Sequence, residues 1–136
     1  MMFVIDASVA ASWCFPDEAS PAADAALRRL AEDSALIPSL FWFELRNVLL
    51  IGERRRRIAE TDTARFLGFV RDLPLEIDPD PDGNLVLGLA RTHRLSFYDA
   101  IYLELAQRKV VPLATLDGEL IAAAKAEKVP LIGEGA

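Results

Sequence analysis

The sequence predicts an α/β fold, in which a five-stranded parallel sheet is flanked by helices on both faces. Short apolar segments alternate with longer segments whose apolar residues recur at helical spacing, and this pattern continues through most of the chain. Apolar residues make up 52% of the 136 residues, enough for a core without a disulfide or structural metal. We expect residues 1–136 to form a single three-layer domain.

The predicted strands are short buried segments bounded by turns or helix starts. Pro112 conflicts with one of them, because proline cannot donate a backbone hydrogen bond and avoids central strands. The strands are residues 3–5, 35–38, 75–77, 110–114 and 130–132.

The predicted helices begin at recognisable start signals. Pro21 opens one helix, Ser39 and Thr61 are N-cap candidates for two others, and Ser96 is expected to begin a further helix. The helices are residues 7–14, 21–33, 40–54, a segment from Thr61 to about Leu73, 84–93, a segment from Ser96 through Leu105, and 117–127.

The charge balance and the cysteine count narrow the class of protein. The formal net charge of −6 lacks the basic excess of a non-specific nucleic-acid binder, but it permits a site where divalent cations offset clustered carboxylates. Cys14 is the only cysteine, which excludes an internal disulfide and a thiolate zinc cage and favours a reducing cytoplasm. We expect no signal peptide and no membrane-spanning segment.

Four acidic residues are predicted to meet at one rim of the sheet. Asp6 directly follows the first strand, and Asp117 follows the fourth with two residues between. Ligands of open parallel sheets bind outside the carboxyl ends of the strands. Glu44 and Asp99 lie in the first turns of their helices, whose N-termini are expected to face the same rim.

Clustered carboxylates beside apolar neighbours are costly to bury unless something pairs with them, and hard cations such as Mg²⁺ or Mn²⁺ prefer oxygen ligands. We predict Asp6 and Asp99 as the principal ligands, with Glu44 and Asp117 completing the site directly or through water. Such ions activate water and polarise phosphodiesters. His93 lies at a predicted helix end, away from the acids, so no histidine base is expected.

Three polar side chains are predicted to support these acids. Ser8 and Thr115 lie two residues from the first and last of them, where their hydroxyls can orient a carboxylate or a water. Asn47 lies three residues after Glu44 on the same helix face, where it can hydrogen-bond that carboxylate or a substrate.

Each acid also has a structural interpretation when taken alone. Asp6 and Asp117 can cap helices, Asp99 can be a first-turn acid favoured by the helix dipole, and Glu44 can be an ordinary exposed residue. The presence of all four in one predicted site favours the functional interpretation.

Three other features of the sequence are less specific. The run Arg54–Arg57 suits either RNA phosphates or an acidic partner, or it is a solvated helix end. Cys14 is expected to be a small buried hydrophobe. Core and dimer packing is favoured over a partner-helix surface for the aromatic residues Trp13, Phe41, Trp42 and Phe43.

Four motifs occur in order along essentially the whole chain. They are Val4-Ile5-Asp6-Ala7-Ser8, Phe43-Glu44-Leu45-Arg46-Asn47-Val48-Leu49, Ser96-Phe97-Tyr98-Asp99-Ala100-Ile101-Tyr102 and Ala114-Thr115-Leu116-Asp117-Gly118-Glu119-Leu120. Together with the α/β pattern they closely resemble the PIN-domain ribonucleases, and most of all the VapC toxins of bacterial toxin–antitoxin pairs.

The resemblance implies a PIN-like five-stranded sheet, magnesium- or manganese-dependent cleavage of RNA, a homodimer, and a cognate VapB-type antitoxin that occupies the active-site groove. Asp6, Glu44, Asp99 and Asp117 match the family's acidic positions, of which Asp6 and Asp99 are the two most often assigned to metal. The matching auxiliary polar positions are Ser8, Asn47 and Thr115. The acidic net charge is a mild departure for an RNA-binding protein.

Two other functions are compatible with the sequence. A phosphatase or phosphotransferase would use Asp6 as a covalent nucleophile, although Asp6-Ala7-Ser8 lacks the second aspartate usual in such enzymes. A non-catalytic PIN-like module would bind RNA or a partner, but loss of acids would mark that class, and all four are present.

Overall fold

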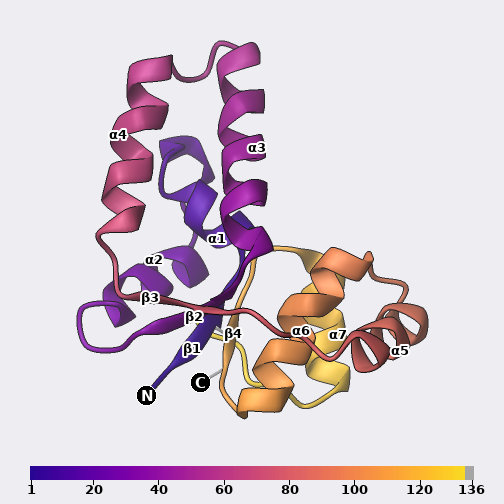
Figure 1. The fold of residues 1–136 in the computed structure, drawn as a ribbon. Helices are drawn as coiled ribbons and strands as arrows, with labels where there is room; N and C mark the ends of the chain where they lie inside the picture. Colours follow the sequence, from indigo (N-terminus) through magenta and orange to yellow (C-terminus); the bar gives the residue numbers. More distant parts are fainter. Residues whose placement is uncertain (134–136) are drawn as a thin grey trace.

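Four short parallel strands form the centre of the structure, a computed structural model that describes residues 1–133 (Figure 1). In space their order is β3-β2-β1-β4, so the first strand lies inside the sheet. This confirms the predicted α/β class with a parallel sheet. The strands are β1 (Phe3–Ile5), β2 (Ala35–Pro38), β3 (Leu75–Asp78) and β4 (Leu113–Ala114).

The predicted fifth strand, residues 130–132, is reduced to a single bridge beyond β4. Leu131 lies opposite Leu113 in parallel register. The N–H of Leu113 donates to the carbonyl of Pro130 over 2.9 Å, and the N–H of Ile132 donates to the carbonyl of Leu113 over 3.0 Å. The segment therefore lies at the expected edge of the sheet but is too short to be a strand.

The predicted strand 110–114 is also shorter than expected, because β4 starts only after Pro112. Val110 ends the preceding helix in the left-handed conformation, with φ of 55°. The carbonyl of Pro112 accepts a hydrogen bond of 2.8 Å from the N–H of Val4. Proline thus takes part as an acceptor at a point where its missing N–H is not needed.

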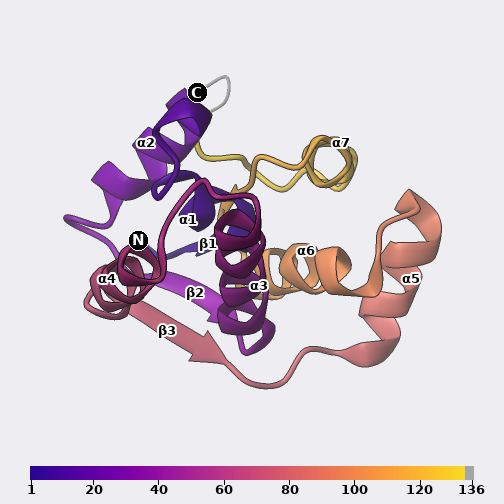
Figure 2. The ribbon, with the colours of Figure 1, turned by 90° about the horizontal axis from the view of Figure 1, so that it is seen from above.

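Helices cover both faces of the sheet (Figures 1 and 2). The four helices of the first half of the chain and a 3₁₀ turn lie on one side, and the three later helices lie on the other. The third and fourth helices form a hairpin that projects away from the sheet (Figure 1). The elements are α1 (Ala7–Ser12), η1 (Pro16–Glu18), α2 (Pro21–Arg29), α3 (Leu40–Arg54), α4 (Glu60–Arg71), α5 (Gly83–His93), α6 (Phe97–Lys109) and α7 (Gly118–Ala126).

Some of the predicted helix starts are confirmed and others are wrong. Ser96 caps α6 by accepting the N–H of Asp99 over 3.0 Å. Ser39 precedes α3 but its side chain makes no capping hydrogen bond. Thr61 is not an N-cap, because α4 already begins at Glu60. The carboxylate of Asp62 instead accepts the N–H of Ala59 over 2.9 Å and fixes that helix start from inside.

The sheet separates two apolar cores. Along β1, Phe3 and Ile5 point into the core under α1 to α4, whereas Val4 points into the core under α5 to α7. Successive side chains of a strand alternate between its faces, so a fully apolar strand is expected between two cores. Asp6, which follows β1, therefore lies at the carboxyl-end rim of the sheet, between the two helical layers.

The predicted aromatic residues do not share one environment. Phe41 is fully buried, Trp13 and Trp42 are partly buried against the same core, and Phe43 is exposed. Cys14 is a partly buried free thiol rather than a fully buried one. Within residues 1–133, none of the helices has the length and apolar character that crossing a membrane would require.

Candidate active site

The four predicted acids line one hollow of about 170 Å³ at the rim of the sheet. They arrive from four places in the fold: the end of β1, the first turns of α3 and α6, and the start of α7. The structure thus brings together residues that lie up to 111 positions apart in the sequence. The hollow is lined by Asp6, Ala7, Ser8, Glu44, Val48, Asp99, Tyr102 and Asp117.

Asp6 is the most buried of the four acids, with 5% of its surface exposed. It caps α1, and its Oδ1 accepts hydrogen bonds from Ser8 Oγ over 2.6 Å and from the N–H of Val9 over 3.1 Å. The hydroxyl of Thr115 donates to its Oδ2. The capping and site interpretations of this residue are therefore compatible. Both carboxylate oxygens are held in fixed directions.

Burial raises the pKa of Asp6 to about 6, although the hydrogen bonds from Ser8, Thr115 and Val9 act to lower it. The negative charge of Asp99 adds to the increase. A carboxylate that is so hard to ionise gains more than an exposed one from a cation placed beside it.

The loop between β4 and α7 is tied to α1 through two hydroxyls. Thr115 Oγ1 accepts the N–H of Asp117 over 3.1 Å, and Ser8 Oγ accepts the N–H of Leu116, also over 3.1 Å. Each hydroxyl also donates to Asp6, so the first and last acids of the set are linked by short hydrogen-bond chains. The two auxiliary hydroxyls predicted beside the acids are therefore both in contact with this network.

Asp117 has a structural role besides lining the hollow. Its Oδ1 accepts the N–H groups of Glu119 over 2.9 Å and Leu120 over 3.0 Å, which caps α7. One carboxylate oxygen is thereby used by the helix, and within residues 1–133 no hydrogen bond engages the other oxygen, Oδ2.

Glu44 is held by a residue that the sequence interpretation missed. Tyr102, on α6, donates its hydroxyl hydrogen to Glu44 Oε1 over 2.6 Å. Burial raises the pKa of Glu44, Asp99 raises it further, and the bond from Tyr102 acts in the opposite direction. The spacing offers a signal for Tyr102, because it lies three residues after Asp99 and so shares its helix face.

Asn47 does not line the same hollow as the acids. It lies with Glu44 in a neighbouring groove, whose other residues are Leu40, Phe43 and Tyr98. Of the two possibilities predicted for Asn47, a bond to Glu44 or a contact with substrate, the position in this groove favours the second.

The pKa of Asp99 is affected by the negative charges near it. Burial raises its pKa, and the nearby carboxylates of Asp117 and Glu119 raise it further, while a hydrogen bond at Ser96 lowers it. Among the described residues that line the hollow, none is basic. The pocket is therefore a negative site without an internal counterion.

The donor chemistry fits a hard divalent cation, since every charged group of the hollow is a carboxylate. Within residues 1–133, however, no three acidic, histidine or cysteine side chains stand close enough to form a ready-made metal cage. Mg²⁺ does not require such a cage, because it usually keeps several waters and takes only about one or two protein carboxylates. Direct ligation by some of the acids and contact through water by the others suits the arrangement.

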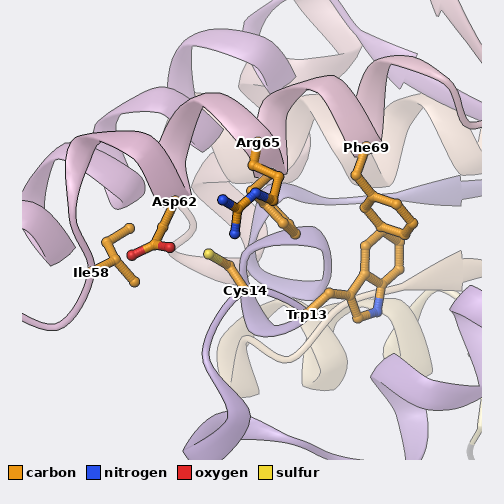
Figure 3. Close-up of a pocket in the computed structure, with 7 residues that line it drawn as sticks. Trp13, Cys14, Ile58, Asp62, Arg65 and Phe69 are labelled. Atoms are coloured by element: carbon orange, nitrogen blue, oxygen red, sulfur yellow. The ribbon is translucent and has the colours of Figure 1, made fainter.

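A larger hollow lies elsewhere and has different chemistry. It measures about 440 Å³ and is lined from the end of α1 and from α4, with Trp13, Cys14, Asp62, Arg65 and Phe69 among its walls (Figure 3). It contains none of the four predicted acids, and its one carboxylate is accompanied by a guanidinium. The smaller hollow is therefore the better candidate for phosphodiester chemistry.

His93 lies outside the candidate site, as predicted. Its Nε2 is 2.6 Å from Glu127 Oε2, and this contact lowers the pKa of Glu127. Gln107 donates to the other oxygen of the same carboxylate over 2.9 Å. These contacts join α5 and α6 to the end of α7 and have a structural role.

Comparisons with known proteins agree with this fold. Residues 3–126 match the PIN domain family, and the chain therefore belongs to that family. The comparison with curated proteins gave no significant match.

Two solved structures have a similar fold. PAE2754 from Pyrobaculum aerophilum shares 26% identity, with a TM-score of 0.70 over 90% of this chain and 79% of that one. VapC20 from Mycobacterium tuberculosis, described as a Sarcin-Ricin loop cleaving toxin, shares 16% identity, with a TM-score of 0.60 over 90% of this chain and 95% of that one. The family resemblance seen in the four motifs is confirmed.

Proposed function

We propose that this protein is a metal-dependent endoribonuclease and the toxin of a VapBC-type toxin–antitoxin pair. The observation that carries the proposal is the meeting of Asp6, Glu44, Asp99 and Asp117 in one hollow without a basic residue among its described lining. Membership of the PIN family and a fold shared with an RNA-cleaving toxin support a nuclease.

In this proposal, Asp6 and Asp99 are the principal ligands for Mg²⁺ or Mn²⁺, and Glu44 and Asp117 contribute directly or through water. A divalent ion bound there would stabilise negative charge on the phosphodiester and lower the pKa of its bound water. Thr115 and Ser8 hold the carboxylate of Asp6 in its orientation.

The chain's own groups also determine where protons reside. Tyr102 keeps Glu44 oriented with one oxygen engaged, which leaves Oε2 to face a water or substrate. Burial and the negative charge of Asp99 raise the pKa of Glu44, while the bond from Tyr102 acts to lower it. We assign Glu44 to accept a proton from the attacking water because it lines the hollow and Tyr102 engages only its Oε1.

The remaining proposals concern the setting of the protein. We expect a homodimer, a VapB-type antitoxin that covers the active-site groove, and action on RNA in the cytoplasm. The acids of the hollow also suit an inhibitor that carries a basic side chain. A guanidinium can pair with the carboxylates that would otherwise bind a metal ion.

The decisive experiment is incubation of the purified protein with transfer, ribosomal and messenger RNA in Mg²⁺, Mn²⁺ or chelator, followed by mapping of the cut ends. Asp6→Asn and Asp99→Asn are expected to abolish cleavage while far-ultraviolet circular dichroism shows a folded protein. Growth arrest on expression is expected to disappear in both variants. Cleavage that persists in both variants with the same metal dependence would contradict the assignment.

The matched control is Asp17→Asn. Asp17 is an exposed carboxylate on η1 that pairs with Arg57, far from the hollow in the described fold. Its substitution removes one negative charge from the protein, as the test variants do, but leaves the hollow intact. We expect its cleavage rate to equal that of the wild type.

A further inference from the structure

A second hollow of about 340 Å³ adjoins the carboxylate site. It is lined by Leu40, Phe43, Glu44, Asn47 and Tyr98. Glu44 is a wall of both hollows, and Tyr98 directly precedes Asp99 in α6. A group bound in this second hollow would therefore be next to whatever occupies the first.

The two aromatic rings of this hollow are unusually exposed. Phe43 has 73% and Tyr98 has 61% of its surface accessible, whereas the nearby Phe41 and Tyr102 are almost fully buried. The fold therefore places one aromatic of α3 and one of α6 in the core, and a second from each helix in solvent at the edge of the acid pocket. Exposed aromatic rings at such a position are suited to stack on a flat ligand.

Asn47 adds directional polar contacts to this apolar site. It lies one helical turn after Phe43, and its amide offers both a donor and an acceptor. Two exposed aromatic rings with one amide suit a nucleobase, whose faces are apolar and whose edge carries hydrogen-bonding groups. An aliphatic chain would make no hydrogen bond with this amide.

The charge along α3 also favours a nucleic-acid strand. Arg46 and Arg54 lie three and eleven residues after Phe43, which places them on the same side of the helix. The guanidinium of Arg46 lies 5.6 Å from the centre of the Trp42 ring. Arg54 is the last residue of α3, about 15 Å from Glu44 along the helix axis.

The Arg54–Arg57 run divides into two parts. Arg57 pairs with Asp17 over 2.8 Å and Glu18 over 2.7 Å, and it stacks on Phe15, so it holds the base of the hairpin turn against η1. Arg54, Arg55 and Arg56 are exposed. Positive charge therefore lies along a path that leaves the acid pocket, despite the net negative charge of the chain.

We propose that Phe43 and Tyr98 form a stacking site for one unpaired base of the RNA, beside the phosphate that enters the carboxylate hollow, with Asn47 contacting the edge of that base. This rests on the proposed ribonuclease function and specifies its substrate as RNA whose bases are unpaired at the cut. Phe43, Asn47 and Tyr98 are then determinants of substrate position and sequence preference.

The test compares Phe43→Ala and Tyr98→Ala with the wild type on an RNA that the wild type cleaves. Stacking on one base is worth a factor of about ten to one hundred, so KM should rise by that factor while kcat stays within about twofold. Tyr98→Phe keeps the ring and should restore most of the affinity. Phe69→Ala is the matched control, because Phe69 is an exposed aromatic on α4 that lies outside both hollows.

A second measurement identifies the base. An abasic nucleotide placed in turn at each position around the cut should weaken cleavage by the wild type strongly at one position. The same abasic substitution should cost Phe43→Ala and Tyr98→Ala less than it costs the wild type, since each variant has already lost one of the two stacking rings. If both variants keep the wild-type KM and the wild-type abasic pattern, the stacking site is disproved while the nuclease function stands.

Failure of the nuclease function itself is recognised separately. If the wild type cuts no RNA in Mg²⁺ or Mn²⁺, binding of a fluorescent single-stranded oligoribonucleotide is measured in chelator with the same variants. Weaker binding in Phe43→Ala and Tyr98→Ala, but not in Phe69→Ala, supports the base site without cleavage. Unchanged binding in these variants overturns the base site. A variant that keeps its RNA affinity but changes its oligomeric state in sedimentation also overturns it, because the groove would then be a contact between two copies of the chain.

Discussion

The hydroxyl of Tyr102 lies 2.6 Å from Oε1 of Glu44 and joins α6 to α3 across 58 positions of sequence. The two helices belong to the cores on opposite faces of the sheet. The bond therefore connects both layers at the rim where the acids meet. Both residues line the hollow, so the bond fixes two of its walls relative to each other.

Tyr102→Phe removes that contact and keeps the ring. We expect metal affinity or kcat/KM to fall by roughly tenfold, since partners that orient metal ligands are typically worth about 10- to 100-fold. The free energy of unfolding should fall by only about 1 kcal/mol. Isothermal titration with Mn²⁺ and cleavage kinetics measure the first effect, and urea denaturation measures the second.

The control for this variant is Thr63→Val. Thr63 donates its hydroxyl to Glu53 over 2.6 Å, which is a similar bond between α4 and α3 outside the hollow. A similar stability change with unchanged cleavage is expected. If Tyr102→Phe behaves like Thr63→Val in every assay, Tyr102 has no positioning role.

Asp6→Asn should change how stability depends on pH. Burial raises the pKa of Asp6 to about 6 from 3.8, so the folded state keeps a proton that the unfolded state releases. In chelator this residue lowers wild-type stability progressively as pH rises from about 4 to 6, by up to about 3 kcal/mol. The variant lacks this loss, so its stability relative to the wild type should increase over that interval and then level off.

The measurement is chemical denaturation of both proteins at half-unit pH steps, and the result is their difference at each pH. Using the difference removes the opposite contribution of Asp78, whose pKa is lowered by its bonds to Arg108. A difference that stays constant from pH 4 to 7 would show that Asp6 ionises as easily in the folded protein as in the unfolded chain.

Added Mn²⁺ or Mg²⁺ should stabilise the wild type. At about ten times Kd, a ligand that binds only the folded state contributes roughly 1.4 kcal/mol. Stabilisation should be weaker at pH 5 than at pH 7, because protons compete for carboxylates whose pKa is raised. In thermal denaturation, Asp99→Asn should lose most of the stabilisation by either ion. If the variant is stabilised by Mg²⁺ and Mn²⁺ as much as the wild type, Asp99 is not one of the ligands.

Arg108→Leu should destabilise the protein by about 3 kcal/mol without altering the hollow. Arg108 donates to Glu104, which is only 2% exposed, and forms two bonds to Asp78 at the end of β3. Its loss leaves a buried carboxylate unpaired. The double variant Arg108→Leu/Glu104→Leu should recover most of the stability. Asp17→Ala, which removes an exposed partner of Arg57, should cost at most about 1 kcal/mol.

Two glycines provide a matched pair for the hairpin. A Cβ at Gly52 in α3 would lie 2.8 Å from Phe15 Cζ, so Gly52→Ala should destabilise by about 1–3 kcal/mol. A Cβ at Gly68 in α4 would meet nothing within 4 Å, and Gly68→Ala should stabilise by about 0.5–1 kcal/mol. Urea denaturation of both variants checks the prediction, and opposite signs are expected.

The sequence alone predicts much of this fold, because its signals are local. The fully apolar β1 and the helical spacing around Leu45 and Leu49 depend on neighbours in the chain. The helix start predicted at Ser96 is correct for the same reason, since α6 begins directly after it. The cap predicted at Thr61 is wrong because Asp62 captures the N–H of Ala59 and starts the helix earlier.

The contacts that shape the site are not local and could not be predicted in this way. Thr115 is close in sequence to Asp117, yet its hydroxyl donates to Asp6. Asn47 has the right spacing for Glu44, but Tyr102 makes the bond. Which of Phe41 and Phe43 is buried depends on the rotation of α3 against the core, whereas the composition of the segment is aromatic at both positions.

The bond from Thr115 to Asp6 has a consequence for synthesis of the protein. The two residues are 109 positions apart, so the carboxylate leaves the ribosome long before the hydroxyl that fixes its orientation. All residues through Asp117 must emerge before the four acids can line one hollow. A nascent chain in which only the first three acids have left the ribosome therefore carries them in an unassembled state.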